Sequence, residues 1–142
     1  MSDYPNRPLI GVGTVVFKED RVLLVQRGKP PREGSWSLPG GRQRLGETVR
    51  EAARREVREE SGLEVEVTAL LDVVDSMTRD SVGTLAYHYT LVDFLAEWRA
   101  GEAAAGGDVR EVLWADPDAL DPYELWDETL RIIALAREVR GL

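Results

Sequence analysis

The 142 residues have a length typical of one domain, and 43% hydrophobic with 31% charged residues is the mixture of a globular protein. Eighteen basic and 26 acidic residues give a formal net charge of −8, which disfavours nucleic acid as a partner, and the lack of cysteine with a single histidine excludes disulfides, thiolate metal sites and multi-histidine zinc sites. Because no apolar run approaches the roughly 18 residues of a membrane helix and the first residues lack a signal-peptide pattern, we expect one cytoplasmic domain over residues 1–142, with no membrane partner and with oxygen ligands for any metal.

The first third of the chain predicts two paired strands followed by a loop. Residues 9–17 (LIGVGTVVF) are short, apolar and β-branched, as in a buried strand, and residues 21–27 (RVLLVQR) follow a polar turn as a second strand. Residues 28–37 hold two prolines and two glycines, which indicates a loop. A helix is then expected from about Glu47 to Ser61, because Gly62 stands at the usual position of a helix stop.

The remainder of the chain predicts three strands and a final helix. Strands are expected at residues 64–74, 84–98 and 110–115, with a turn at 78–83 and a small-residue loop at 99–108. Apolar residues recur at helical spacing from Leu125 to Val139, which predicts a C-terminal amphipathic helix. Strands outnumber helices and the helices are dispersed among them, so the pattern favours an α/β domain with helices packed on a mixed sheet.

The first predicted helix carries glutamates on the side where apolar residues are expected. At about 100° per residue, one side holds Val49, Ala52, Ala53, Glu56, Glu59 and Glu60, and the opposite side holds Arg50, Glu51, Arg54 and Arg58. Three carboxylates facing the body of the protein would repel one another and lose their hydration, unless cations lie between them. Clustered oxygen ligands suit Mg²⁺ or Mn²⁺. The alternative, a solvated surface helix, is disfavoured because the opposite side already carries the solvating charges.

Two glycines precede this helix. Gly40 and Gly41 follow Pro39, so the backbone can turn sharply there and approach a ligand without an intervening Cβ. A carbonyl exposed at this turn would add a further oxygen ligand for a metal. An ordinary strand-to-helix turn would explain a lone glycine pair equally well.

The spacing of these residues resembles the Nudix box at every specified position. Gly41 is followed after five residues by Glu47, and after seven more by Arg55-Glu56-Val57-Arg58-Glu59-Glu60-Ser61-Gly62-Leu63. The strand before the motif, the lead-in SWSLPGG and the later segment WADPDAL are also similar to the family. The resemblance implies an α/β/α sandwich with a mixed β-sheet between the box helix and a C-terminal helix.

The resemblance also implies a function and a metal site. Nudix enzymes use divalent cations to hydrolyse a nucleoside diphosphate linked to another moiety, so the implied partner is a nucleotide-type small molecule and the implied cofactor is Mg²⁺ or Mn²⁺. Glu56, Glu59 and Glu60 would hold the metal, with the carbonyl of Gly41, or of neighbouring Gly40, as a further ligand. The implied role of Arg55 and Glu47 is to pair and so orient the helix and its loop.

Residues outside the box are candidates for the catalytic base and for substrate contacts. In some Nudix enzymes the base is a glutamate of the box and in others an acid of a late loop. Glu56 is therefore our first candidate, with Asp108 and Glu111 as alternatives that would otherwise be solvated loop acids. The candidate substrate contacts are Arg27, Arg42 and Arg44, which are also plausible surface arginines, and Trp36, for which packing is favoured over stacking on a base.

Two classes of function remain. The first is an enzyme that hydrolyses a phosphoanhydride bond in an ADP-ribose-like compound, a nucleotide sugar or a nucleoside triphosphate. The second is a catalytically silent Nudix-fold nucleotide-binding or sensor domain, which usually has a degraded box. The box is intact here, so we expect an enzyme. Dimers are frequent in the family, which makes a homodimer an expected assembly.

Overall fold

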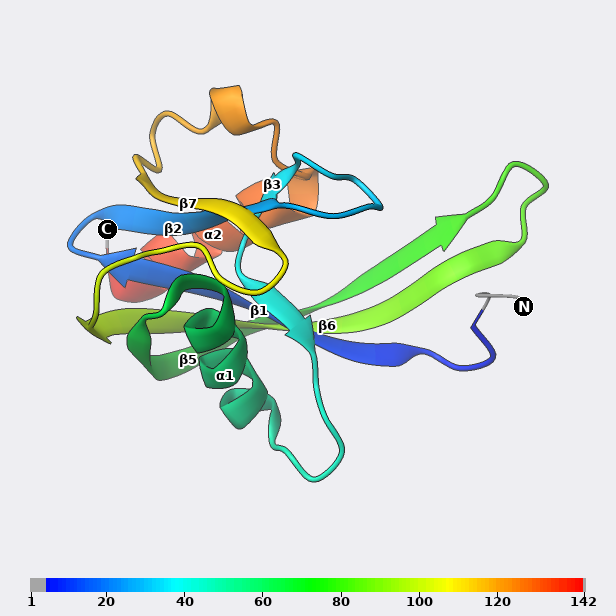
Figure 1. Cartoon of the computed structure of the whole chain (residues 1–142), viewed down its shortest axis with the longest axis horizontal. Coiled ribbons are helices and arrows are strands. Elements are labelled where there is room, and N and C mark those ends of the chain that lie inside the picture. The colour runs from blue at the N-terminus through cyan, green and yellow to red at the C-terminus, as the bar shows by residue number, and fades with distance from the viewer. Residues whose placement is uncertain (1–4, 142) are drawn as a thin grey trace.

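The computed structural model describes residues 5–141, which form a sheet with a helix on each face (Figure 1). The elements in chain order are β1 (Leu9–Lys18), β2 (Arg21–Arg27), β3 (Trp36–Ser37), β4 (Gly40–Arg42), α1 (Val49–Ser61), β5 (Glu64–Arg79), β6 (Leu85–Ala100), β7 (Val109–Ala115), the 3₁₀ helix η1 (Asp121–Tyr123) and α2 (Asp127–Arg140). No helix within the described part is long and apolar enough to cross a membrane.

The sheet is mixed, as the sequence predicts. Its main strand order is β3-β2-β1-β6-β5, with β4 paired to β1 and β7 paired to β2. The pairing of β1 with β6 is parallel, and the other pairings are antiparallel. The short strand β4 therefore lies beside the central strand β1, which fixes the position of the glycine pair.

The two faces of β1 pack against different helices because its side chains alternate. Val15 and Phe17 join the cluster that contains Ile132 and Ile133 of α2. Val12 joins the cluster that contains the alanines of α1. The mixed sheet thus lies between the box helix and the C-terminal helix, and the predicted α/β/α sandwich is confirmed.

Helix α1 has well-formed signals at both ends. Thr48 is its N-cap, and the Thr48 and Glu51 side chains bond each other's backbone N–H groups in a capping box. At the other end Gly62 adopts the left-handed conformation and donates its N–H to the Arg58 carbonyl, as the sequence predicts. The helix begins at Val49, two residues after the predicted start, because Glu47 belongs to the preceding loop.

The hairpin of β5 and β6 extends beyond the rest of the molecule (Figure 1). The strand predicted at residues 64–74 ends later than expected, because β5 continues to Arg79. The hairpin turn closes where the Asp80 N–H donates to the Thr84 carbonyl. Along this arm the two strands satisfy each other's backbone groups, so the strand persists after its side chains leave the core. Apolar patterning follows the core and therefore does not reveal this extension.

Candidate functional site

The glycine pair of β4 lies directly against α1. Gly40 and Gly41 pair with Gly13 and Val12 of β1. A Cβ on Gly41 would stand only 2.5 Å from the carboxyl carbon of Glu56, so the absence of a side chain allows the Glu56 carboxylate to lie against the backbone. The expected sharp turn at this pair is not formed, because both glycines lie in the extended strand β4 and pair with β1. The strand brings backbone groups and a helix carboxylate together.

Arg55 joins the loop after β4 to the helix. Its guanidinium donates to both oxygens of Glu47, at 2.6 and 3.0 Å, and to the Arg42 carbonyl at 2.9 Å. The hydrogen bond from Arg55 lowers the pKa of Glu47 to about 2, so this carboxylate stays ionised. The two side chains are only 15% and 14% exposed. The pair expected from the sequence is therefore formed, and it holds the loop against α1.

The other glutamates of the box differ in burial and partners. Glu60 is largely buried and accepts a hydrogen bond from the Gly40 N–H at 2.8 Å. The pKa of Glu60 is raised to about 7, chiefly by burial and also by the negative charges of Glu56 and Glu59. Burial also raises the pKa of Glu56, which accepts from Arg55 at 2.6 Å. Glu59 is exposed and pairs with Arg44 and Arg55, so the expectation that it faces the body of the protein is wrong. Its ion pairs with the two arginines hold it at the surface of the helix.

The donor set fits a divalent cation, although the cluster is not closed around one point. Within residues 5–141 no three acidic, histidine or cysteine side chains meet closely enough to enclose a metal ion. Glu59 is bound to Arg44 and Arg55, whereas the Glu60 carboxylate has no ion pair among the described residues. Glu60 is thus a mostly buried carboxylate without a cationic partner in the described part of the chain, and it lies beside the glycine backbone of β4. This arrangement is expected of a hard-cation site.

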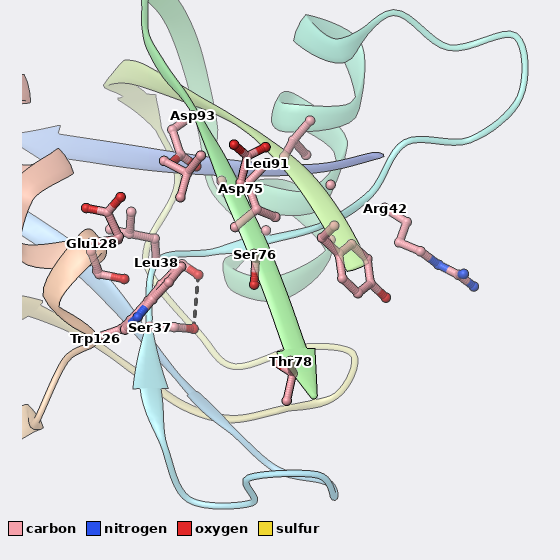
Figure 2. A pocket seen from close by; sticks show the side chains of 18 of the residues that line it. Ser37, Leu38, Arg42, Asp75, Ser76, Thr78, Leu91, Asp93, Trp126 and Glu128 are labelled. Carbon is pink, nitrogen blue, oxygen red and sulfur yellow. Dashed lines mark hydrogen bonds between the residues drawn. The ribbon is translucent and has the colours of Figure 1, made fainter. Parts of the chain in front are cut away.

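Two cavities adjoin β4, the strand that contains the glycine pair. The first, here called the Asp93 pocket, has a volume of about 520 Å³ and is lined by Gly11, Gly13, Gly40, Gly41 and Arg42, by Leu38, Leu91 and Asp93, and by Trp126 and Glu128 at the start of α2, among others. The second, the Glu56 cavity, has about 390 Å³ and is lined by Leu9, Ile10, Arg42, Gln43, Arg44 and Glu56. Figure 2 shows Arg42 pointing away from Asp93 and Glu128. Arg42, the last residue of β4, lines both cavities, so the two cavities meet beside this strand.

The family model of the NUDIX domain matches residues 7–136. The chain belongs to the Nudix family. The structure agrees: the MutT NUDIX hydrolase of Burkholderia pseudomallei superposes with a TM-score of 0.79 at 30% identity, over 92% of this chain and 98% of that one.

Curated Nudix relatives carry different substrate names. An ADP-ribose pyrophosphatase of Methanocaldococcus jannaschii is 38% identical over 77% of this chain and 62% of its own length. The 8-oxo-dGDP phosphatase NUDT18 of Danio rerio is 32% identical over 92% of this chain and 36% of its own length. This chain therefore spans less than two thirds of either relative.

The candidate residues outside the Nudix box have different partners in the structure. Arg27 at the end of β2 donates to the carbonyls of the following loop and lies near enough for its charge to lower the pKa of Glu60. Asp108 is exposed and forms an ion pair with Lys29 at 2.9 Å. Glu111 lies on β7 opposite Gln26, facing neither cavity.

Trp36 packs edge-on against Tyr123, with ring centroids 5.5 Å apart, and it does not line the Asp93 pocket. Among the residues that line the pocket, Asp93, Trp126 and Glu128 are three that the sequence did not single out. One signal for them was present: Gly11 and Gly13 stand two apart in a strand, where glycine often marks the close approach of another group.

Proposed function

We propose that this chain hydrolyses a phosphoanhydride bond in a nucleoside diphosphate linked to another moiety, by attack of water on phosphorus and with Mg²⁺ or Mn²⁺ as cofactor. The observation that carries the proposal is that two largely buried box glutamates, Glu60 and Glu56, lie against the glycine pair of β4. The glycine pair lines the Asp93 pocket, and Glu56 lines the Glu56 cavity. Acid residues beside a backbone strand that lines a nucleotide-sized pocket suit phosphate chemistry only when cations accompany the substrate.

Each residue of the box then has a defined task. Glu56, Glu59 and Glu60, with the Gly41 carbonyl, would hold the cation, which when bound supplies neutralisation of phosphate charge and activation of water. Glu56 is the proposed general base, because it is the box glutamate that lines a cavity and burial raises its pKa above the usual value. Asp108 and Glu111 remain the alternatives; Asp108 is paired with Lys29, and Glu111 lies opposite Gln26 on β7.

Arg55 acts as a positioning residue, since it holds Glu47 and the Arg42 carbonyl and so keeps the loop in place. Arg42 and Arg44 line the Glu56 cavity and supply positive charge for the phosphates of the substrate. Arg27 is a further proposed phosphate or ribose contact, and Trp36 supports the pocket through its packing on Tyr123.

The relatives support a nucleotide substrate, and ADP-ribose-like compounds, nucleotide sugars and nucleoside triphosphates all remain within the proposal. The test is a chromatographic screen for the release of nucleoside mono- or diphosphate from these classes, with Mg²⁺ or Mn²⁺ and in EDTA. Release is expected with metal, and Glu60→Gln should lower it by orders of magnitude. Glu51→Gln is the matched control, because Glu51 lies on the exposed side of the same helix and Gln also serves in a capping box. Tight nucleotide binding without turnover in any condition would instead support the sensor alternative.

A further inference from the structure

Asp93 is a buried carboxylate that the box chemistry does not use. It lies on β6 with 7% of its surface exposed, and it lines the pocket to which it gives its name (Figure 2). Its neighbour across the parallel pairing is Gly13 on β1. The Asp93 carboxylate lies so close to the Cα of Gly13 that a Cβ at that position would clash with it. None of the hydrogen bonds or ion pairs among residues 5–141 involves the Asp93 carboxylate.

The neighbouring acids have partners of their own. Arg131 forms ion pairs with Asp72 at 3.0 Å and with Glu128 at 2.7 Å. The guanidinium of Arg131 is therefore paired with two other carboxylates, and no hydrogen bond joins Arg131 to Asp93. Burial, followed by the negative charge of Asp72, raises the pKa of Asp93 to about 6. This end of the pocket is consequently rich in hydrogen-bond acceptors, and Asp93 has its acceptor capacity unused.

A buried carboxylate without a partner is costly, so a ligand that donates hydrogen bonds to it gains affinity. A phosphate group is excluded as that ligand by charge. The pocket also offers an aromatic surface, because Trp126 lines it and remains 49% exposed. A flat, apolar group that carries N–H donors on its edge matches both features, and a nucleobase is such a group.

We propose that Asp93 is a specificity-determining residue that accepts hydrogen bonds from a guanine-type base edge. This proposal rests on the proposed function for the nature of the ligand. The two oxygens of a carboxylate match two adjacent donors, which guanine presents as its ring N1–H and its 2-amino group. Adenine presents one donor beside an acceptor, and uracil presents one donor between two acceptors, so neither pairs with both oxygens.

The test compares three nucleotides that differ only in this edge: GMP, IMP, which lacks the 2-amino group, and AMP. Dissociation constants are measured by NMR titration with Mg²⁺ at pH 8, where Asp93 is ionised. None of the three nucleotides contains a phosphoanhydride bond, so none is consumed during the titration. We expect GMP to bind about tenfold or more tighter than IMP, the effect of one hydrogen bond to a charged group, and AMP to bind more weakly than IMP.

Asp93→Asn supplies the second measurement. Asparagine presents one acceptor and one donor, which complements adenine, so the preference should move from GMP towards AMP. The control is Asp118→Asn, an exposed residue paired with Arg137 outside the pocket, which should keep the wild-type order. Equal binding of GMP and IMP by the wild type, no detectable binding of any of the three, or an unchanged order in Asp93→Asn would each overturn the proposal.

Turnover is scored separately from binding. If the wild type prefers GMP but hydrolyses no nucleoside diphosphate derivative with Mg²⁺, the proposed function fails and the role of Asp93 as a base contact stands. If it hydrolyses such compounds but shows no preference for the guanine edge, only the role of Asp93 fails.

Discussion

Glu60 holds its proton more tightly in the folded chain than in the unfolded one, because burial raises its pKa from 4.5 to about 7. Between these two values the folded state binds more protons than the unfolded state, so the free energy of unfolding falls as the pH rises. The loss is absent below pH 4.5, where both states are protonated, and is complete above pH 7. A shift of this size corresponds to about 3 kcal/mol.

Replacing Glu60 with Gln should therefore stabilise the metal-free protein at pH 8 by up to about 3 kcal/mol, and should change little at pH 4. The amide oxygen of Gln can still accept the hydrogen bond of the Gly40 N–H, so the contact with β4 is preserved. Denaturant unfolding in EDTA at several pH values measures the difference, with Glu51→Gln as the control. A Glu60→Gln variant that is less stable than wild type at pH 8 would show that the acid has a structural role.

At the scale of elements, the loop after β4 is held to α1 chiefly by Arg55. Arg55→Ala breaks a largely buried ion pair and leaves Glu47 without its partner, so we expect a loss of about 3 kcal/mol in unfolding free energy. Hydrolytic activity should fall with it, since Arg55 also binds the carbonyl of Arg42 at the end of β4, the strand that contains the glycine pair. Arg58→Ala is the matched control: it removes an exposed pair with Glu64 on the same helix, and both properties should change little. Equal effects of the two substitutions would contradict the assigned role of Arg55.

The two glycines of β4 should respond differently to a methyl group. A Cβ on Gly40 would meet the backbone carbonyl of Val12, which cannot move without disturbing β1, so Gly40→Ala should cost about 2 kcal/mol or more. A Cβ on Gly41 would meet the end of the Glu56 side chain, which can rotate away. Gly41→Ala should therefore cost less than about 1 kcal/mol but weaken Mg²⁺ binding about tenfold or more. Chemical denaturation and calorimetric metal titration separate these outcomes, and normal metal affinity in Gly41→Ala would refute the proposed place of Glu56.

The sequence predicts the elements that local signals control. The spacing from Gly41 to Leu63, the stop at Gly62 and the pairing of Arg55 with Glu47 all depend on residues close in the chain, and the structure contains the helix, its cap and the pair. The Asp93 pocket was not predicted, because it forms only when β1, β6 and the start of α2 come together. A single aspartate within an apolar strand gives no local sign of the glycine beneath it.

At the scale of the whole molecule, a net charge of −8 opposes the binding of a polyphosphate. Two of the arginines of the box already have acidic partners, since Arg55 holds Glu47 and Arg44 contacts Glu59. The stability of the whole domain and its affinity for substrate should consequently both depend on the divalent cation.

Mg²⁺ should raise the melting temperature of the wild-type protein. A ligand that binds only the folded state stabilises it by about 2.7 kcal/mol at a concentration of one hundred times its Kd, which corresponds to several degrees in Tm for a domain of this size. Glu60→Gln should lose most of this rise, because it removes a negative charge from the site, whereas Glu51→Gln should keep all of it. Differential scanning calorimetry in Mg²⁺ and in EDTA gives the comparison, with calcium-free and nucleotide-free buffer so that the cation alone is the ligand. The carboxylates of α1 repel one another, so a bound cation that neutralises their charge must stabilise the fold that holds them together. An identical Tm for the wild type in Mg²⁺ and in EDTA would therefore place these carboxylates outside any metal site.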